Sequence, residues 1–202
     1  MSTAQEFCPM STPATRTRHL ALAAAVLAAA TLATGCASKF EKRLPDYSAR
    51  AVFFPTGEPQ PVAGTKIQGT IEFSQNKGVL VAKGEIKGLK PNSTVGFHVH
   101  EKGSCMKMDA SDAGPHFNPG KAPHGAFDGK EAHHAGDLPP LKADATGKAV
   151  VNFTTQAISL DKSAENGVIG RAIVVHESAD DPTAQPAGNS GKRLACGVIR
   201  LT

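Results

Sequence analysis

Aromatic residues are scarce in this chain: tryptophan is absent, tyrosine occurs once, and aromatic side chains make up 5% of the sequence. No block of basic residues is interleaved with aromatics, and the formal net charge is only +4. Nucleic-acid binding usually requires such a basic footprint, so the sequence indicates no nucleic-acid partner. Glycine and proline, in contrast, number 20 and 14. This content of turn-forming residues favours short strands joined by loops over a helical bundle.

Long apolar runs are also rare, and the clearest one is Leu20–Ala33, which follows Arg16 and Arg18. The run is too short to span a bilayer comfortably, but a basic flank and a short apolar stretch are typical of a secretion signal. We therefore expect residues 1–35 to be a signal peptide. Met10 is an alternative start of the chain, because the two arginines lie unusually far from Met1.

The apolar run ends in Thr34-Gly35-Cys36, which resembles a bacterial lipoprotein cleavage site. In such a site the cysteine becomes the lipidated first residue. We expect Cys36 to carry a lipid that attaches the protein to the membrane of the cell envelope in the periplasm. A plain signal peptide, cut near the same place, is the alternative. Residues 36–47 are then a charged tether, and residues 48–202 form one domain.

Cysteine is infrequent, with four residues at positions 8, 36, 105 and 196. Cys8 lies in the leader and Cys36 would carry the lipid, which leaves Cys105 and Cys196. In an oxidising compartment these two are expected to form a disulfide. Two free thiols are the alternative.

Strand signals run through residues 48–202. Ile67, Ile71 and Phe73 alternate with polar residues, which is the period of a half-buried strand. Similar segments, separated by turn signals, predict an all-β antiparallel sandwich or barrel with strands near 67–73, 79–86, 94–101, 149–155, 167–176 and 194–201. Residues 102–137 and 177–192 have neither period, and loops this long are usually functional or disordered.

The histidines are concentrated near the first of these loops. His98 and His100 lie two positions apart on an expected strand, so their side chains share one face and form a two-nitrogen chelate. His176 closes another apolar strand and offers a third nitrogen. An imidazole-rich site with an open position suits copper. Within the loop, three histidines and a carboxylate form a set suited to tetrahedral zinc: His116, His124, His134 and Asp137.

Five motifs then appear in order: Gly-Phe-His-Val-His-Glu, Gly-Pro-His-Phe-Asn-Pro, His-x-Gly-Asp-Leu, Gly-Arg-x-x-Val-Val-His-Glu and Arg-Leu-Ala-Cys-Gly-Val-Ile. Over roughly Ala49 to Thr202 the chain resembles the copper–zinc superoxide dismutase family. The resemblance implies a Greek-key antiparallel β-barrel of about eight strands with two long functional loops.

The resemblance also implies the roles of individual residues. His98, His100, His116 and His176 match copper ligands, while His116, His124, His134 and Asp137 match zinc ligands, so that His116 bridges the metals. Cys105 and Cys196 match the family disulfide, Arg193 matches an arginine beside copper, and Asp180 matches a carboxylate that links His98 to His124. His133 is left as a solvated neighbour.

The implied reaction is dismutation of superoxide to oxygen and hydrogen peroxide, as copper is alternately reduced and oxidised. Arg193 would bind the anion, and His116 would release copper and carry a proton. The segment Asp181–Ala187 is shorter than its eukaryotic counterpart and lacks the charged cluster found there, so Lys192 and Lys107 are candidates for attracting superoxide. Alternatives are a periplasmic copper or zinc buffer, a non-enzymatic relative and a structural module. The sequence does not distinguish a monomer from a homodimer.

Overall fold

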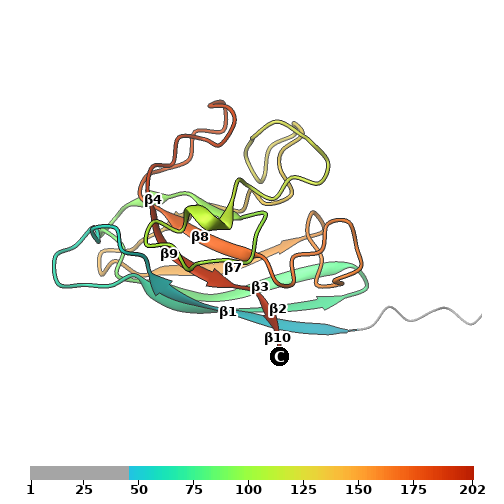
Figure 1. The fold of residues 1–202 in the computed structure, drawn as a ribbon, viewed down its shortest axis with the longest axis horizontal. Coiled ribbons are helices and arrows are strands. Elements are labelled where there is room, and N and C mark those ends of the chain that lie inside the picture. Colours follow the sequence, from blue (N-terminus) through green and yellow to red (C-terminus); the bar gives the residue numbers. More distant parts are fainter. Residues whose placement is uncertain (1–45) are drawn as a thin grey trace, which may run out of the picture. The chain divides into compact units, whose positions relative to one another are not determined.

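The computed structural model describes residues 46–202 (Figure 1). The expected signal peptide, the lipidation site Cys36 and most of the expected tether lie outside these residues. The first strand begins at Tyr47, which was expected to be the last residue of the tether. Within residues 46–202 no helix combines the length and the apolar character that crossing a membrane requires.

The described residues form an all-β fold with a single short 3-10 helix, η1, between its strands. In chain order the elements are β1 (Tyr47–Pro55), β2 (Gln68–Asn76), β3 (Val79–Lys87), β4 (Thr94–Val95), β5 (Phe97–Val99), η1 (Ser111–Ala113), β6 (Leu141–Lys142), β7 (Ala149–Thr155), β8 (Ala172–His176), β9 (Arg193–Val198) and β10 (Arg200–Leu201).

Eight of the strands form one curled antiparallel sheet (Figure 1). The order of its strands is β5-β8-β9-β1-β2-β3-β7, with β10 paired to β1, and β4 pairs separately with β6. After the β1-β2-β3 meander the chain crosses to β5 at the opposite edge, returns to β7, and crosses again to β8. This Greek-key connectivity and the strand number confirm the fold expected from the sequence.

Alternation of side chains explains the sheet. In β1 the residues Ala49, Ala51 and Phe53 are buried, while those between them face outward. The same period appears in β2, where Ile71 and Phe73 join the core. Burying one face of each strand removes apolar surface from water at about 25 cal/mol per Å², which sets the register of the sheet.

Three expected strands are shorter or broken in the structure. The strand expected at 94–101 divides at Gly96, whose N–H donates to the carbonyl of Ser178 at 2.8 Å instead of joining a strand ladder. A Cβ at Gly96 would lie 2.7 Å from the Ser190 Cβ, so only glycine permits this close approach. The local sequence pattern did not predict this break, because Gly96 contacts Ser178 and Ser190, which are distant in the chain.

The other two differences meet at one corner. The strand expected at 167–176 starts only at Ala172, and the strand expected at 194–201 is interrupted at Ile199. Gly170 donates to the carbonyl of Ile199, and Ile199 donates to that of Arg171, at 2.8 and 3.0 Å. These two hydrogen bonds join the turn before β8 to Ile199, the residue between β9 and β10.

Candidate metal centre

Strand β5 places two histidines on one face. Phe97 and Val99 are buried in the hydrophobic core, and His98 and His100 are fully buried on the opposite side of the strand. The strand period therefore makes a rigid pair of imidazoles, as the sequence predicted. At the adjoining end of β8, His176 is also buried.

Two segments of the long loop after β5 are held against this strand by backbone hydrogen bonds. Phe117 donates to the carbonyl of Val99 at 2.8 Å, and Val99 donates to that of Gly136 at 2.9 Å. Isolated bridges consequently pair His100 with His116 and His98 with Asp137. Although the loop has almost no regular secondary structure, its ligating residues are placed as precisely as residues of a sheet.

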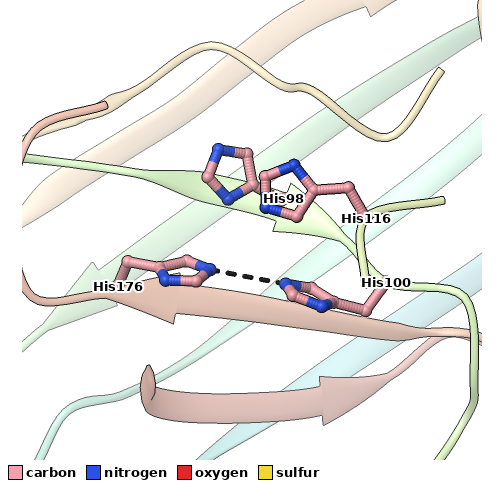
Figure 2. Close-up of side chains that lie close together, drawn as sticks. All are labelled: His98, His100, His116 and His176. Atoms are coloured by element: carbon pink, nitrogen blue, oxygen red, sulfur yellow. Dashed lines mark hydrogen bonds between the residues drawn. The ribbon is translucent and has the colours of Figure 1, made fainter. Parts of the chain in front are cut away.

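The first group of converging side chains is the four-histidine cluster: His98, His100, His116 and His176. Each offers a ring nitrogen, these atoms lie within 4.8 Å of one another, and all four residues are buried. Figure 2 shows the four imidazoles facing a common centre, with the rings of His98 and His116 above those of His100 and His176. The ring centroids of His98 and His116 are 4.0 Å apart.

The protons on His100 and His176 indicate what this centre would bind. His100 Nδ1 lies 2.8 Å from the carbonyl oxygen of Gly114, and His176 Nδ1 lies 3.5 Å from that of Gly191. A carbonyl oxygen only accepts, so these contacts assign the proton of each neutral ring to Nδ1. Nε2 then carries an unprotonated lone pair. The two Nε2 atoms are 3.4 Å apart, joined by the dashed line in Figure 2. Two facing lone pairs repel unless a cation lies between them.

The second group is the aspartate cluster: His116, His124, His134 and Asp137. Asp137 Oδ1 lies 3.0 Å from His116 Nδ1 and 3.2 Å from His134 Nδ1. Its Oδ2 lies 3.1 Å from His124 Nδ1. Three imidazoles and one carboxylate, all buried, form a closed four-ligand set of the kind that binds structural zinc.

Backbone donors orient the carboxylate of this cluster. The N–H groups of Gly125 and His134 both donate to Asp137 Oδ2 at 3.1 Å. Despite burial, which opposes ionisation, the hydrogen bonds from His116 and His134 keep the pKa of Asp137 well below its usual range. Asp137 is therefore an anion, the form in which a carboxyl group binds a metal.

Burial keeps three imidazoles of the four-histidine cluster neutral, those of His100, His116 and His176. It lowers the pKa of His116 to about 4 and the pKa values of His100 and His176 well below the ordinary value. Neighbouring histidines add to these shifts, since charges on adjacent rings would repel. Neutral imidazole is the form that binds metals.

The ring nitrogens of His98 and His124 test whether metals fit. All four are buried and none makes a hydrogen bond of acceptable geometry among residues 46–202. Asp180 Oδ2 lies 3.1 Å from both Nε2 atoms and Asp137 Oδ2 lies 3.1 Å from His124 Nδ1, while His98 Nδ1 has no such carboxylate neighbour. A buried polar atom without a partner costs free energy of about 1–3 kcal/mol. His98 belongs to the four-histidine cluster and His124 to the aspartate cluster, so a cation in each would satisfy both Nδ1 atoms. The residues present therefore fit two metals that share His116.

Asp180 lies next to one histidine of each cluster. Its Oδ2 lies 3.1 Å from His98 Nε2 and 3.1 Å from His124 Nε2, which are the ring nitrogens facing away from the cluster centres. The pKa of Asp180 is lowered: burial opposes ionisation, but the hydrogen bond to His98 and the charges of His98 and His124 together outweigh it. A carboxylate in this place fixes the tautomer and orientation of both rings. Asp180 thus lies between one histidine of each cluster.

Arg193, the first residue of β9, is half-buried beside the four-histidine cluster. Its Nη1 donates to the carbonyl of Ala110 at 2.7 Å, and its Nη2 donates to that of Gly114 at 2.8 Å. Its positive charge contributes to the lowered pKa values of His100 and His176. The side chain is therefore held in one orientation close to the copper ligands expected from the sequence.

The two lysines considered for attraction of an anion differ in setting from Arg193. Lys192 Nζ forms an ion pair with Glu58 Oε2 at 2.9 Å, so its charge is largely offset. Lys107 contributes its backbone N–H to Asp112 Oδ2 at 3.2 Å. His133, expected to be a solvated neighbour, bonds through Nδ1 to the carbonyl oxygen of His134 at 2.8 Å and belongs to neither cluster.

The expected disulfide is present between Cys105 and Cys196, whose Cα atoms are 5.9 Å apart. It joins the loop after β5 to strand β9 across 91 positions of sequence. Asp112 organises the loop on its other side, because its Oδ2 accepts hydrogen bonds from the Ser104 hydroxyl and the Met106 N–H. No local pattern in the sequence marks Asp112 for this role.

The chain is similar in sequence to proteins of known family. Residues 67–199 match the family described as copper/zinc superoxide dismutase (SODC). The chain is 40% identical over 140 residues to superoxide dismutase (Cu-Zn) 1 of Aquifex aeolicus, covering 68% of this chain and 82% of that protein. It is 37% identical over 189 residues to the extracellular superoxide dismutase (Cu-Zn) of Drosophila melanogaster, covering 87% of this chain and 97% of that protein.

Similarity extends to solved structures. The crystal structure of a double mutant of a superoxide dismutase-like protein from Bacillus subtilis superposes with a TM-score of 0.61 and 36% sequence identity. The superposition covers 75% of this chain and 96% of that one.

Proposed function

The chain belongs to the copper/zinc superoxide dismutase family, and we propose that it removes superoxide in the bacterial cell envelope with copper in its four-histidine cluster and zinc in its aspartate cluster. The observation that carries this assignment of metals is the membership of His116 in both clusters. One imidazole that serves two cations must lose both ring protons, which adjacent metal charges make feasible.

The cofactors of the enzyme are copper and zinc. Copper supplies the one-electron chemistry of the reaction, and zinc, which has no redox chemistry, supplies fixed positive charge and geometry. His98, His100, His116 and His176 would hold copper. His116, His124, His134 and Asp137 would hold zinc.

Arg193 binds and orients the substrate anion. Its guanidinium remains charged at any working pH and presents a fork of donors. The two carbonyls that accept from it use Nη1 and Nη2, which fixes the plane of the fork. Superoxide would meet this positive charge beside the copper ligands, where burial strengthens the attraction.

His116 holds and releases a proton during turnover. Burial lowers the pKa of His116 to about 4 in the metal-free chain, so the ring is neutral near pH 7. When the ring leaves copper, its freed nitrogen could take up a proton and pass it to a peroxide anion. In the metal-free chain Asp137 Oδ1 lies 3.0 Å from His116 Nδ1 and orients the ring. With zinc bound, both residues would be its ligands. Asp180 fixes the rings of His98 and His124 on the far side.

Three observations support export of the protein to the cell envelope. The disulfide between Cys105 and Cys196 is a bond that persists in oxidising compartments. The basic and apolar pattern of residues 1–35 has the form of a signal peptide, and one relative is named as extracellular. We infer a periplasmic enzyme attached to the membrane through lipid on Cys36. Mass spectrometry of the mature N-terminus tests this, with a Cys36→Ala variant expected to leave the membrane fraction.

The proposed function is tested with the exported full-length protein, loaded with copper and zinc. We expect rapid dismutation of superoxide that disappears after chelator treatment and returns with both metals. A His116→Ala variant should lose activity, because it removes a ligand from each cluster. Metal binding without chelator-sensitive dismutation would contradict the proposal and favour a copper or zinc buffer. Analytical ultracentrifugation of the same sample distinguishes a monomer from a homodimer.

A further inference from the structure

The loop between β8 and β9 reaches the aspartate cluster through a second residue besides Asp180. The side-chain amide of Gln185 is paired with the backbone of His124 in both directions. Gln185 Oε1 accepts from the His124 N–H at 2.9 Å, and Gln185 Nε2 donates to the His124 carbonyl at 2.9 Å. One side chain thereby satisfies both backbone polar groups of a residue that the aspartate cluster requires.

The segment around His124 depends on such side-chain contacts, because residues 118–126 belong to no strand or helix. Asn118 makes a similar two-way pair with the backbone of Ala122, at 2.8 and 3.0 Å. Gly125 donates to Asp137 Oδ2 at 3.1 Å. Asn118, Gln185 and Asp137 thus hold three successive points of this segment, and Gln185 holds the point that carries the His124 ring.

The loop that carries Gln185 is itself well supported. Asp181 donates to the carbonyl of Gly188 at 2.9 Å, and Gly188 donates to that of Ala184 at 2.8 Å. The loop packs closely on the site, since a Cβ at Gly188 would lie 2.5 Å from His124 Nε2. Gln185 therefore projects from a structured base and can fix the position of His124.

Asp180 and Gln185 act on different parts of the same residue. Asp180 Oδ2 lies 3.1 Å from the ring atom His124 Nε2, which sets the rotation of the imidazole. The amide of Gln185 sets the position of the backbone from which the ring extends. With both held, His124 Nδ1 stays directed at Asp137 Oδ2, 3.1 Å away.

We propose that Gln185 is a positioning residue for zinc: its paired hydrogen bonds to the His124 backbone preorganise the aspartate cluster and raise its zinc affinity. The inference rests on the zinc assignment proposed above. Partners that orient a metal ligand typically contribute about 10–100-fold to metal affinity. Because both hydrogen bonds go to His124, which belongs to the aspartate cluster and not to the four-histidine cluster, the effect of Gln185 should fall on zinc far more than on copper.

The test measures zinc affinity of the copper-free full chain by competition with a chromophoric chelator. Gln185→Met keeps the approximate length of the side chain and removes both hydrogen bonds, and Gln185→Ala removes the side chain. We expect zinc affinity to fall about 10–100-fold in both variants. Cobalt(II) substituted for zinc should show weaker tetrahedral absorption bands, which a loss of stability alone would not produce.

Gln75→Ala is the matched control. Gln75 is a buried glutamine on β2 that also joins a loop through its amide, accepting from the Leu160 N–H and bonding the Ser159 hydroxyl. This variant should lower stability and leave zinc affinity unchanged. Wild-type affinity in Gln185→Met, or an equal loss in Gln75→Ala, would overturn the role of Gln185. Failure of the wild-type chain to bind zinc would instead overturn the zinc assignment.

Discussion

His100 and Arg193 are linked through one peptide: His100 Nδ1 and Arg193 Nη2 both bond to the carbonyl oxygen of Gly114, each at 2.8 Å. The carbonyl has two lone pairs and can accept both. It fixes the proton on His100 at Nδ1, which leaves Nε2 free for a metal, and it orients the guanidinium at the same time. The anion-binding group and a proposed copper ligand are therefore positioned by a single backbone atom.

Replacing Arg193 with alanine should lower kcat/KM by about 10–100-fold, since a hydrogen bond to a charged group contributes about 1.5–3 kcal/mol. Metal content should not change, because Arg193 is not a ligand. The measurement is a superoxide dismutation assay together with metal analysis of the same sample.

Arg193→Lys is the informative companion variant. It keeps the charge but cannot present a planar fork to the carbonyls of Ala110 and Gly114. We expect an intermediate activity. Turnover in Arg193→Ala equal to that of the wild type would show that substrate binding does not depend on this residue.

Asp180→Asn should weaken binding of both metals by about 10–100-fold, because the carboxylate orients one histidine of each cluster. Competition titrations with copper and with zinc measure the two effects separately. The adjacent Asp181 provides the control, since its carboxylate is exposed and bonds to Thr183 instead of a histidine of either cluster. Asp181→Asn should retain both affinities. A loss confined to one metal in Asp180→Asn would contradict the bridging role.

Replacing Cys105 and Cys196 together with serine should lower the free energy of unfolding by about 4–5 kcal/mol. The bridge spans 91 positions, so it removes much conformational freedom from the unfolded chain. Denaturant unfolding of the metal-free protein measures the effect. Reductant should destabilise the wild type by a similar amount and leave the double variant unchanged, and a reductant effect on the double variant would point to another cause.

Acid should destabilise the metal-free protein. The pKa of His116 is about 4 in the folded chain, and those of His100 and His176 are also lowered, whereas an unfolded histidine titrates near 6.5. Between these values the unfolded chain binds more protons, so the free energy of unfolding falls as pH decreases below about 6.5. Each such proton contributes a slope of up to about 1.4 kcal/mol per pH unit.

Denaturant unfolding at about pH 7.5 and about pH 5.5 measures this dependence. Loading with copper and zinc should raise the free energy of unfolding at both pH values without reducing the loss at the lower one, because protons compete with the metals for the same nitrogens and weaken binding as pH falls. A metal-free protein of equal stability at both pH values would show that the histidines are not held neutral.

Local periodicity made several parts of this protein predictable. The alternation of Phe97, His98, Val99 and His100 is enough to place two imidazoles on one face of a strand, because successive side chains of a strand point in opposite directions. The same period marked Ile71 and Phe73 as core residues, and both are buried. The motifs that carry the family resemblance also identified the four-histidine and aspartate clusters, whose side chains the structure brings together.

Contacts between distant segments were beyond such patterns. The break at Gly96, the pairing of Lys192 with Glu58 and the organisation of a loop by Asp112 each depend on a neighbour that is remote in sequence. A glutamine between Ala184 and Pro186 carries no local signal of its partner. Only the folded chain brings its amide to His124.

The sequence by itself determined the chemistry of this protein: which side chains can bind metals, which cysteines can pair and which strands bury one face. These follow from residue type and from the fixed geometry of a strand. The tertiary structure alone decided how those groups are held, through the shared carbonyl of Gly114, the carboxylate of Asp180 and the amide of Gln185. Such contacts arise only when loops without a period of their own are packed against β5 and β9.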